Sequence, residues 1–251
     1  MIVISVINSK GGVAKSTTAV CLAHGLALRD KRTLLMDLDP QGAVASLLGM
    51  NQEQCVFDLL VSKPSDLKTE QAIRASGRKN LYIIPGNRRT ATAQAVLTAD
   101  KEPLTYLRDR VKDIAADYDF MIIDTAPGLG DLLYMALRMS DYYLTPSACD
   151  FLSSEGIFRI QDIIKAIKER EDYAPRWLGI LPTYYDHTKE SAATIEDLRK
   201  HFDKQILQPI HRATILREAA AAGLTIFEQD RKSRAAEEYN QLIDYVLQEV
   251  K

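Results

Sequence analysis

Residues 2–17 decide the fold, and they read Ile-Val-Ile-Ser-Val-Ile-Asn-Ser-Lys-Gly-Gly-Val-Ala-Lys-Ser-Thr. The β-branched start, residues 2–7, predicts a buried strand. Residues 16–29 predict a helix, because apolar side chains recur there at helical spacing: Ala19, Leu22, Ala23, Leu26 and Ala27. The turn between them directs backbone N–H groups and a helix N-terminus at one place, which is how proteins bind phosphate. This stretch therefore predicts a strand, a phosphate-binding loop and a helix.

The loop carries two lysines. Lys15 is expected to reach the β- and γ-phosphates of a nucleotide, and the Ser16 hydroxyl is expected to ligate Mg²⁺. The strict pattern G-x-x-x-x-G-K-[ST] is not met, because Ser9 and Ala14 stand where its glycines would be. The pattern that is met is K-G-G-x-x-K-[ST], with Lys10 as the additional lysine. Ala14 is expected to have a negative φ, since its Cβ makes a positive φ unfavourable.

Short apolar runs alternate with helical patterns along the rest of the chain. Strands are predicted at 33–36, 81–84, 120–123, 142–144 and 177–181, and helices at 103–116, 155–170 and 195–202. This alternation predicts an α/β fold with a doubly wound, mostly parallel sheet and helices on both faces. No repeat or linker-like stretch divides the sequence, so residues 1–251 are predicted to form one domain. Ligands of such sheets bind beyond the carboxyl ends of the strands.

Acidic residues follow two of these strands. Asp37 and Asp39 stand in the sequence Asp-Leu-Asp-Pro-Gln-Gly at 37–42, and Asp124 ends the strand at 120–123. Phosphoryl transfer needs an oriented nucleophile and neutralised charge, which carboxylates and a metal ion supply. The strand-end carboxylates are therefore candidates for the catalytic and metal site, although a turn-capping role remains open for Asp37 and Asp39.

Together these motifs resemble the ParA/MinD family of deviant-Walker P-loop ATPases, and the resemblance runs nearly end to end. It implies a homodimer formed around Mg²⁺ and ATP, with catalytic residues Lys10, Lys15 and Asp39. Lys10 would contact the partner's phosphates, and Asp39 would position the attacking water. The metal ion would be organised by Ser16, Asp37, Asp39 and Asp124. The nucleotide would be bound by Lys10, Gly11, Gly12, Val13, Ala14, Lys15, Ser16, Thr17, Thr183 and Arg212.

Further segments are similar to parts of the same family. Residues 179–186 and 210–212 resemble the strand and loops beside the base, which is why Thr183 and Arg212 are assigned to the nucleotide pocket. A solvent-exposed loop role is the alternative for both. Gly128, Leu129 and Gly130 would form a second switch segment and part of the dimer contact.

The formal net charge is −2, so the protein as a whole is not a polyanion binder, and any nucleic-acid contact must be local. Between residues 199 and 234 eight Lys or Arg face four acids, a local net of +4. The resemblance to ParA proteins without a helix-turn-helix implies sequence-independent DNA binding there, unless these are ordinary solvated helix faces. The candidate DNA contacts are Arg199, Lys200, Lys204, Arg217, Arg231, Lys232 and Arg234, with Arg217 standing in for a basic residue that relatives carry at Ile215.

The resemblance implies an ATPase that segregates or positions DNA or a protein cargo, with hydrolysis stimulated by a ParB-like or analogous adaptor. The alternative is a MinD-like, membrane-associated regulator of cell division. Residues 235–251 are amphipathic but acidic, and are expected to pack on the sheet through Leu242, Ile243, Val246 and Leu247.

No apolar run reaches the ~20 residues of a membrane span, and residues 1–7 do not resemble a signal peptide. The expected location is the cytoplasm, in association with the nucleoid. No helix-turn-helix precedes the loop, so operator binding is not expected. Cys21, Cys55 and Cys149 show no C-x-x-C spacing, which disfavours the iron–sulfur reductases that share this loop. No motif indicates the substrate pocket of a metabolic ligase or kinase.

Overall fold

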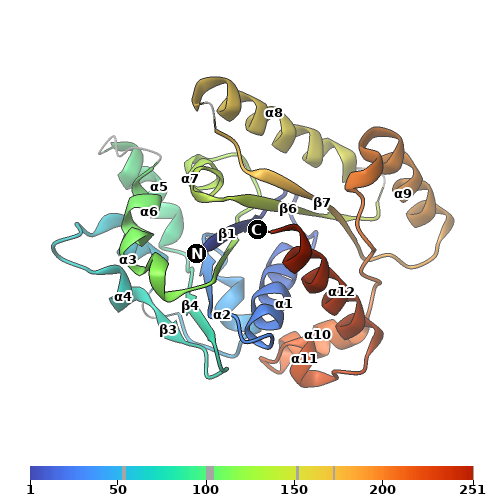
Figure 1. The fold of residues 1–251 in the computed structure, drawn as a ribbon, viewed down its shortest axis with the longest axis horizontal. Helices are drawn as coiled ribbons and strands as arrows, with labels where there is room; N and C mark the ends of the chain where they lie inside the picture. Colours follow the sequence, from blue (N-terminus) through green and yellow to red (C-terminus); the bar gives the residue numbers. More distant parts are fainter. Residues whose placement is uncertain (53–54, 100–104, 151–152, 172, 251) are drawn as a thin grey trace.

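The computed structural model describes residues 1–52, 55–99, 105–150, 153–171 and 173–250. In these residues seven strands form one sheet in the order β3-β4-β2-β5-β1-β6-β7 (Figure 1). Every neighbouring pair is parallel except β3 with β4. The bounds are β1 (Ile2–Val6), β2 (Thr33–Asp37), β3 (Arg74–Ala75), β4 (Leu81–Ile84), β5 (Phe120–Asp124), β6 (Tyr142–Ala148) and β7 (Arg176–Thr183). The predicted doubly wound, mostly parallel sheet is confirmed.

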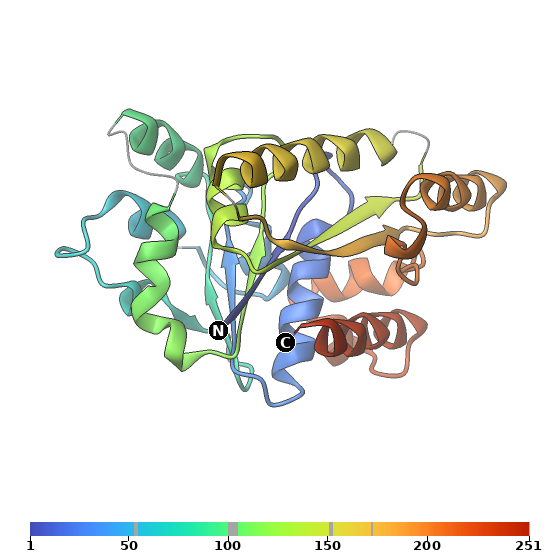
Figure 2. The ribbon, with the colours of Figure 1, turned by 45° about the horizontal axis from the view of Figure 1, so that its top comes forward.

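Helices cover both faces of the sheet (Figures 1 and 2). One face carries α1 (Lys15–Ala27), α2 (Ala43–Leu47), α10 (Thr214–Ala221), α11 (Ile226–Gln229) and α12 (Arg234–Glu249). The other face carries α3 (Val56–Val61), α4 (Thr69–Ala72), α5 (Thr90–Ala99), α6 (Tyr106–Val111), the 3₁₀ helix η1 (Lys112–Asp117), α7 (Asp131–Met139) and α8 (Ser153–Glu171). Beyond β7 lie α9 (Lys189–Phe202) and the 3₁₀ helix η2 (Asp203–Gln205).

The central strands are apolar on both sides because both faces are covered. In β1, Ile4 packs with the α1 side of the core and Val3 with the α7 side. In β5, Ile122 packs with the α1 side, and Met121 and Ile123 with the other. Every residue of β2 and β5 is buried, so the polar residues that end these strands are held rigidly.

Two predicted segments differ from the structure in detail. Positions 103–104 of the predicted helix at 103–116 lie outside the described residues, and the remainder is the short α6 followed by 3₁₀ turns in η1. The C-terminal tail forms α12, in which Leu242, Ile243 and Val246 are buried and Leu247 is partly buried. The tail packs against α1 as well as the sheet: a Cβ at Gly25 would lie 1.9 Å from Ile243 Cδ1, so glycine permits this close approach.

Among the described residues, no helix combines the length and apolar composition that crossing a membrane requires.

Candidate functional site

The sheet order brings three strand ends together. Strand β5 lies between β2 and β1, and Asp37 pairs in register with Asp124 at the ends of β2 and β5. Asp124 also pairs with Val6, where β1 leads into the phosphate loop. The two acidic segments and the two-lysine loop, which lie up to 115 residues apart in the sequence, therefore meet at the carboxyl edge of the sheet.

The backbone at Ala14 contradicts the expectation from the sequence. Ala14 has φ 63° and ψ 28°, a left-handed conformation, so the predicted negative φ is wrong. The loop turns here directly into α1, and Gly12 is also left-handed with φ 73°. A residue with a Cβ in this conformation costs roughly 1–2 kcal/mol. Ala14 is the N-cap of α1 and makes no side-chain capping bond, so the first N–H groups of the helix face the loop as potential anion donors.

Lys15 points back into its own loop. Its ammonium donates a hydrogen bond to the carbonyl of Lys10 at 2.8 Å, and its side chain is buried. Burial lowers the pKa of Lys15, while the nearby carboxylates of Asp124 and Asp39 act in the opposite direction. The side chain thus lies over the cradle where a nucleotide's phosphates are expected, facing the acidic residues.

Lys10 points the other way, toward the end of β6. Its Nζ lies 2.6 Å from Asp150 Oδ1 in an ion pair whose side chains are 30% and 46% exposed. Its backbone N–H donates to Asn8 Oδ1 at 2.9 Å, and Asn8 in turn donates to the carbonyl of Pro146. A Cβ at Gly156 would approach Asn8 Oδ1 to 2.5 Å, so α8 packs tightly on this turn. The loop holds the two lysines in different environments, one inside it and one on its rim.

Asp37 and Asp39 both accept backbone hydrogen bonds. Asp37 Oδ1 accepts from the N–H of Asp39 at 2.9 Å and Oδ2 from the N–H of Val44 at 3.2 Å. Asp39 Oδ1 accepts from the N–H of Gln41 at 2.8 Å. Burial, followed by the negative charge of Asp124, holds the pKa of Asp37 well above its ordinary value. Asp37 therefore braces the turn that positions Asp39, and its part in metal binding stays a prediction.

Asp124 is the least satisfied polar group of the site. It is fully buried, and neither carboxylate oxygen has a hydrogen-bond partner of ordinary geometry in the described part of the chain. Burial raises the pKa of Asp124 to about 7, and the nearby Ser16 hydroxyl and Lys15 ammonium partly offset the rise. Buried carboxylates without partners are rare and call for a ligand.

Oxygen ligands and a few retained waters are what Mg²⁺ prefers. The Ser16 hydroxyl, with the Asp124 carboxylate behind it, fits a hydrated Mg²⁺ that a nucleotide also coordinates. No group of three or more His, Cys, Asp or Glu residues gathers into a metal site among the residues described. The donor set is thus suited to an ion that arrives with phosphates and water, not to a permanent all-protein cage.

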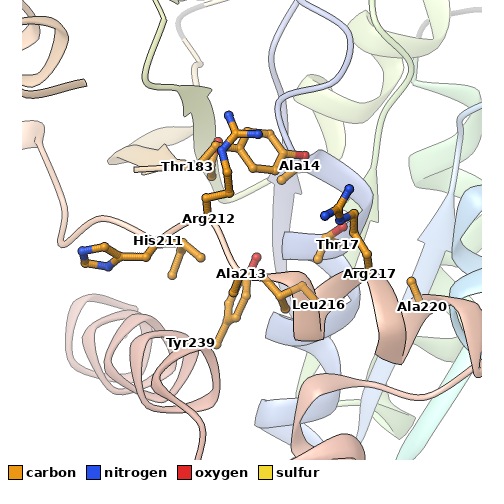
Figure 3. A pocket seen from close by; sticks show the side chains of 12 residues that line it. Ala14, Thr17, Thr183, His211, Arg212, Ala213, Leu216, Arg217, Ala220 and Tyr239 are labelled. Atoms are coloured by element: carbon orange, nitrogen blue, oxygen red, sulfur yellow. The ribbon is translucent and has the colours of Figure 1, made fainter. Parts of the chain in front are cut away.

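A cavity of about 160 Å³ lies beside the loop (Figure 3). Thr183, at the end of β7, donates to the carbonyl of Val13 at 3.3 Å, and the Arg212 guanidinium lies 5.4 Å from the Tyr184 ring centre. The cavity is lined by Ala14, Thr17, Thr183, Tyr184, Ile210, His211, Arg212, Ala213, Leu216, Arg217, Ala220 and Tyr239. Its largely apolar walls beside a phosphate loop suit a nucleoside. The structure places the predicted Thr183 and Arg212 together at this cavity.

Sequence reasoning missed several lining residues, which come from α10 and α12. Leu216 and Ala220 belong to the apolar side of α10, and Tyr239 is a fully buried residue of α12. Their spacing resembles that of ordinary core positions, so no sequence signal distinguishes them. Arg217, which was predicted to contact DNA, is exposed as that role requires, but it also borders the cavity.

The candidate DNA-contacting residues are all exposed but belong to separate elements. Arg199 and Lys200 are in the last turn of α9, and Lys204 is in η2. The others lie on the C-terminal helices and the loop between them: Arg217 in α10, Arg231 and Lys232 after α11, and Arg234 at the start of α12. The structure therefore divides the predicted basic face into an α9 group and a C-terminal group.

The predicted second switch segment follows β5. Gly128 has φ 115°, which favours glycine, and Leu129 is 43% exposed despite its large apolar side chain. The segment leads into α7, whose first residue is Asp131. Pro127, just before this segment, lines the pocket at the phosphate loop, and the exposed Leu129 is available for contact with another molecule.

A two-lysine phosphate loop at the carboxyl edge of a doubly wound sheet defines a P-loop nucleotide-binding protein. Comparison with known proteins agrees, since the family described as an AAA domain matches residues 1–174. The sporulation initiation inhibitor protein Soj of Bacillus subtilis is 35% identical over 94% of this chain and 94% of its own length. The chromosome partitioning protein ParA of Myxococcus xanthus is 33% identical over 94% of this chain and 84% of its own.

Among solved structures, apo McdA from Cyanothece matches with a TM-score of 0.88, at 20% identity over 98% of this chain and 99% of that one. This chain belongs to the ParA/MinD family of P-loop ATPases. ATP hydrolysis is the activity of that family, and its members include chromosome-partitioning ATPases.

Proposed function

We propose that this protein is a Mg²⁺-dependent ATPase that dimerises on binding ATP, binds DNA without sequence preference and positions or segregates DNA or a protein cargo. In this proposal residues 1–251 act as one domain. The observation that carries it is the arrangement of the two lysines. Lys15 faces the phosphate cradle of its own loop, whereas Lys10 lies on the rim, bound to Asp150.

The residues of the loop divide the chemistry among them. Backbone N–H groups at the start of α1 and the Lys15 ammonium bind the phosphates, and the Ser16 hydroxyl and Asp124 hold hydrated Mg²⁺. Mg²⁺, when bound, neutralises charge on the β- and γ-phosphates. Asp39 Oδ1 accepts a hydrogen bond from the Gln41 N–H, and the Asp39 N–H donates one to Asp37 Oδ1. Held by these two bonds, Asp39 orients the attacking water. Thr183 and Arg212 line the nucleoside cavity.

Lys10 couples this chemistry to assembly. Its ion pair with Asp150 is partly exposed, and pairs of this kind contribute about 0–1 kcal/mol. A partner's triphosphate carries more negative charge than one carboxylate, so it can displace Asp150. A cation delivered by a second subunit stabilises the transition state much as an arginine finger does. A monomer lacks that cation and therefore hydrolyses ATP slowly. The stimulating adaptor protein acts on the dimer.

Two observations support DNA over a membrane as the surface that the dimer binds. The seven candidate basic side chains are exposed, and dimerisation doubles the number that face the phosphate backbone. The apolar side of α12 is buried against the body of the protein and is not available to lie in a bilayer. We therefore place the protein in the cytoplasm, associated with the nucleoid.

Light scattering during gel filtration tests the proposal. The wild-type mass should double with Mg²⁺ and a slowly hydrolysed ATP analogue. Lys10→Ala should bind a fluorescent nucleotide with near-normal affinity yet remain monomeric, whereas Lys15→Ala should lose nucleotide binding. A wild-type protein that stays monomeric while saturated with nucleotide would show that the proposed assembly is wrong.

A further inference from the structure

Two histidines and a glutamate form a cluster beside the nucleoside cavity. His211 Nδ1 lies 2.5 Å from Glu238 Oε1, and the His211 backbone N–H donates to Glu238 Oε2 at 2.9 Å. The Nε2 atoms of His211 and His187 share a hydrogen bond at 3.1 Å. In Figure 3 the His211 imidazole points away from the other labelled side chains, so the cluster lies outside the cavity although His211 borders it.

The Glu238 contact fixes the tautomer of His211. A carboxylate can only accept hydrogen bonds, so Nδ1 of His211 carries the proton and donates it. In the neutral ring the lone pair is then on Nε2, the atom that faces His187. A histidine held by a carboxylate in this way presents its second nitrogen as the metal ligand. Without an ion, this Nε2 accepts a hydrogen bond from the Nε2–H of His187, which a metal ion would replace.

The geometry of the two rings matches a shared metal ion. Two nitrogens that each lie 2.0–2.1 Å from a tetrahedral ion are about 3.3 Å apart, close to the 3.1 Å seen between His187 and His211. The ring centroids are 4.7 Å apart with the rings inclined at 40°. That centroid separation is shorter than an end-to-end pair with this nitrogen distance would have, so the two rings are inclined to each other and not collinear.

His187 is held in place as well. Asp186 Oδ1 accepts hydrogen bonds from the hydroxyls of Thr188 and Ser191, at 2.7 and 2.6 Å, which ties this loop to the start of α9. The ring of Tyr185 packs against His187 and His211, with centroids 4.8 and 5.0 Å away. Both rings are therefore positioned before any ligand binds.

We propose that His187 Nε2 and His211 Nε2 bind a divalent transition-metal cation such as Zn²⁺, with Glu238 orienting His211 from behind. Imidazole ligands suit Zn²⁺ and its first-row neighbours but not Mg²⁺, which requires oxygen ligands. No third His, Cys, Asp or Glu completes the site in the described part of the chain, so water fills the remaining positions. Glu238 Oε1 also pairs with Arg234, whose Nε lies 3.4 Å away and whose side chain is 55% exposed. Arg234 therefore competes with His211 for this carboxylate oxygen.

The site links parts of the chain that surround the nucleoside cavity. His187 follows Tyr184, which lines the cavity, His211 precedes Arg212, and Glu238 precedes Tyr239. A bound ion would restrain the cavity wall formed by these three segments. The inference concerns the apo protein and does not depend on the proposed dimerisation or DNA binding.

Titration of tag-free, nucleotide-free protein with Zn²⁺ in excess Mg²⁺, followed by calorimetry, tests this site. One Zn²⁺ per chain should bind, and Co²⁺ in its place should give the visible absorption of a four-coordinate ion. His187→Ala should weaken Zn²⁺ binding at least tenfold, and Glu238→Gln should weaken it about 10–100-fold. His201→Ala removes an exposed histidine from α9 and should leave binding unchanged.

His187 is exposed, so its variant is expected to fold, and circular dichroism verifies this. The inference is overturned if wild-type protein shows no saturable Zn²⁺ binding, or if His187→Ala binds Zn²⁺ as tightly as His201→Ala does.

Discussion

At the scale of single residues, Ala14 shows how a phosphate loop can form at a conformational cost. Its left-handed backbone is one that glycine adopts without steric penalty. Ala14→Gly should therefore raise the free energy of unfolding by about 0.5–1 kcal/mol, after the greater entropy of an unfolded glycine is included. Urea denaturation measures this change. Ala192→Gly, at an exposed position inside α9, is the matched control and should instead cost about 1 kcal/mol.

The buried environment of Asp124 leads to a second prediction, about stability and metal-dependent nucleotide binding. Its carboxylate is buried without a hydrogen-bond partner of ordinary geometry among the described residues, so ionising it costs free energy unless a cation is near. Asp124→Asn should leave the nucleotide-free protein as stable as wild type or more stable, yet weaken Mg²⁺-dependent nucleotide binding tenfold or more. Titration with a fluorescent nucleotide in Mg²⁺ and in EDTA separates the two effects. A stable variant with unchanged Mg²⁺ dependence would remove Asp124 from the metal site.

At the scale of elements, His24 joins α1 to α11. Its Nδ1 lies 2.7 Å from the Thr225 hydroxyl. Burial lowers the pKa of His24 from 6.5 to about 4, with Glu228 opposing the shift and Arg78 and Arg231 adding to it. Between these pH values the unfolded chain binds a proton that the folded protein does not. The stability that His24 contributes is thus complete above pH 6.5 and is lost as the pH falls toward 4.

His24→Asn should flatten this pH dependence. The contribution of His24 to the free energy of unfolding changes by about 3 kcal/mol at most between pH 6.5 and 4. Urea midpoints measured across the same pH range give the slope. His201→Asn on α9 is the control and should follow the wild-type slope. Parallel slopes for wild type and His24→Asn would contradict the assignment.

The elements also show what the sequence could and could not predict. The buried strands β1, β2, β4 and β5 were predictable because their apolar runs are continuous and end at polar or turn residues. The helices α3, α4 and α5 were not predicted. With 6 and 4 residues, α3 and α4 are too short for an apolar periodicity to be recognised, and α5 is covered by its packing against α3. The two-residue, antiparallel β3 is held by its pairing with β4, which no local pattern signals.

The same contrast holds in the site. Lys15 and Ser16 could be found because they follow β1 at a motif's spacing, and Asp124 because it ends the apolar strand β5. The nucleoside cavity could not be fully assigned, because Leu216 and Tyr239 reach it from helices that follow the loop by about 200 residues. The φ of Ala14 was predicted with the wrong sign, since the turn into α1 prevails over the intrinsic preference of alanine.

At the scale of the whole molecule, DNA retention should require ATP and fall steeply with salt, because the contacts are to phosphates. Arg217 borders the nucleoside cavity, so charge reversal there would confuse the two sites. Lys200→Glu and Lys232→Glu test the α9 group and the C-terminal group separately. Each should reduce retention on a DNA column while leaving ATP-driven dimerisation intact. Equal retention of the nucleotide-free and ATP-bound forms would contradict the switch.

The central claim is that Lys10 acts across a dimer, and mixing two inactive variants tests it most directly. Lys10→Ala should bind ATP but neither dimerise nor hydrolyse it, and Asp39→Ala should form a stable dimer that does not turn over. In the mixed dimer, Lys10 of the Asp39→Ala subunit reaches the site whose own Asp39 is intact. One complete site should restore up to about half the wild-type rate per dimer. If Lys10 serves its own subunit, every site keeps one lesion and the mixture stays inactive.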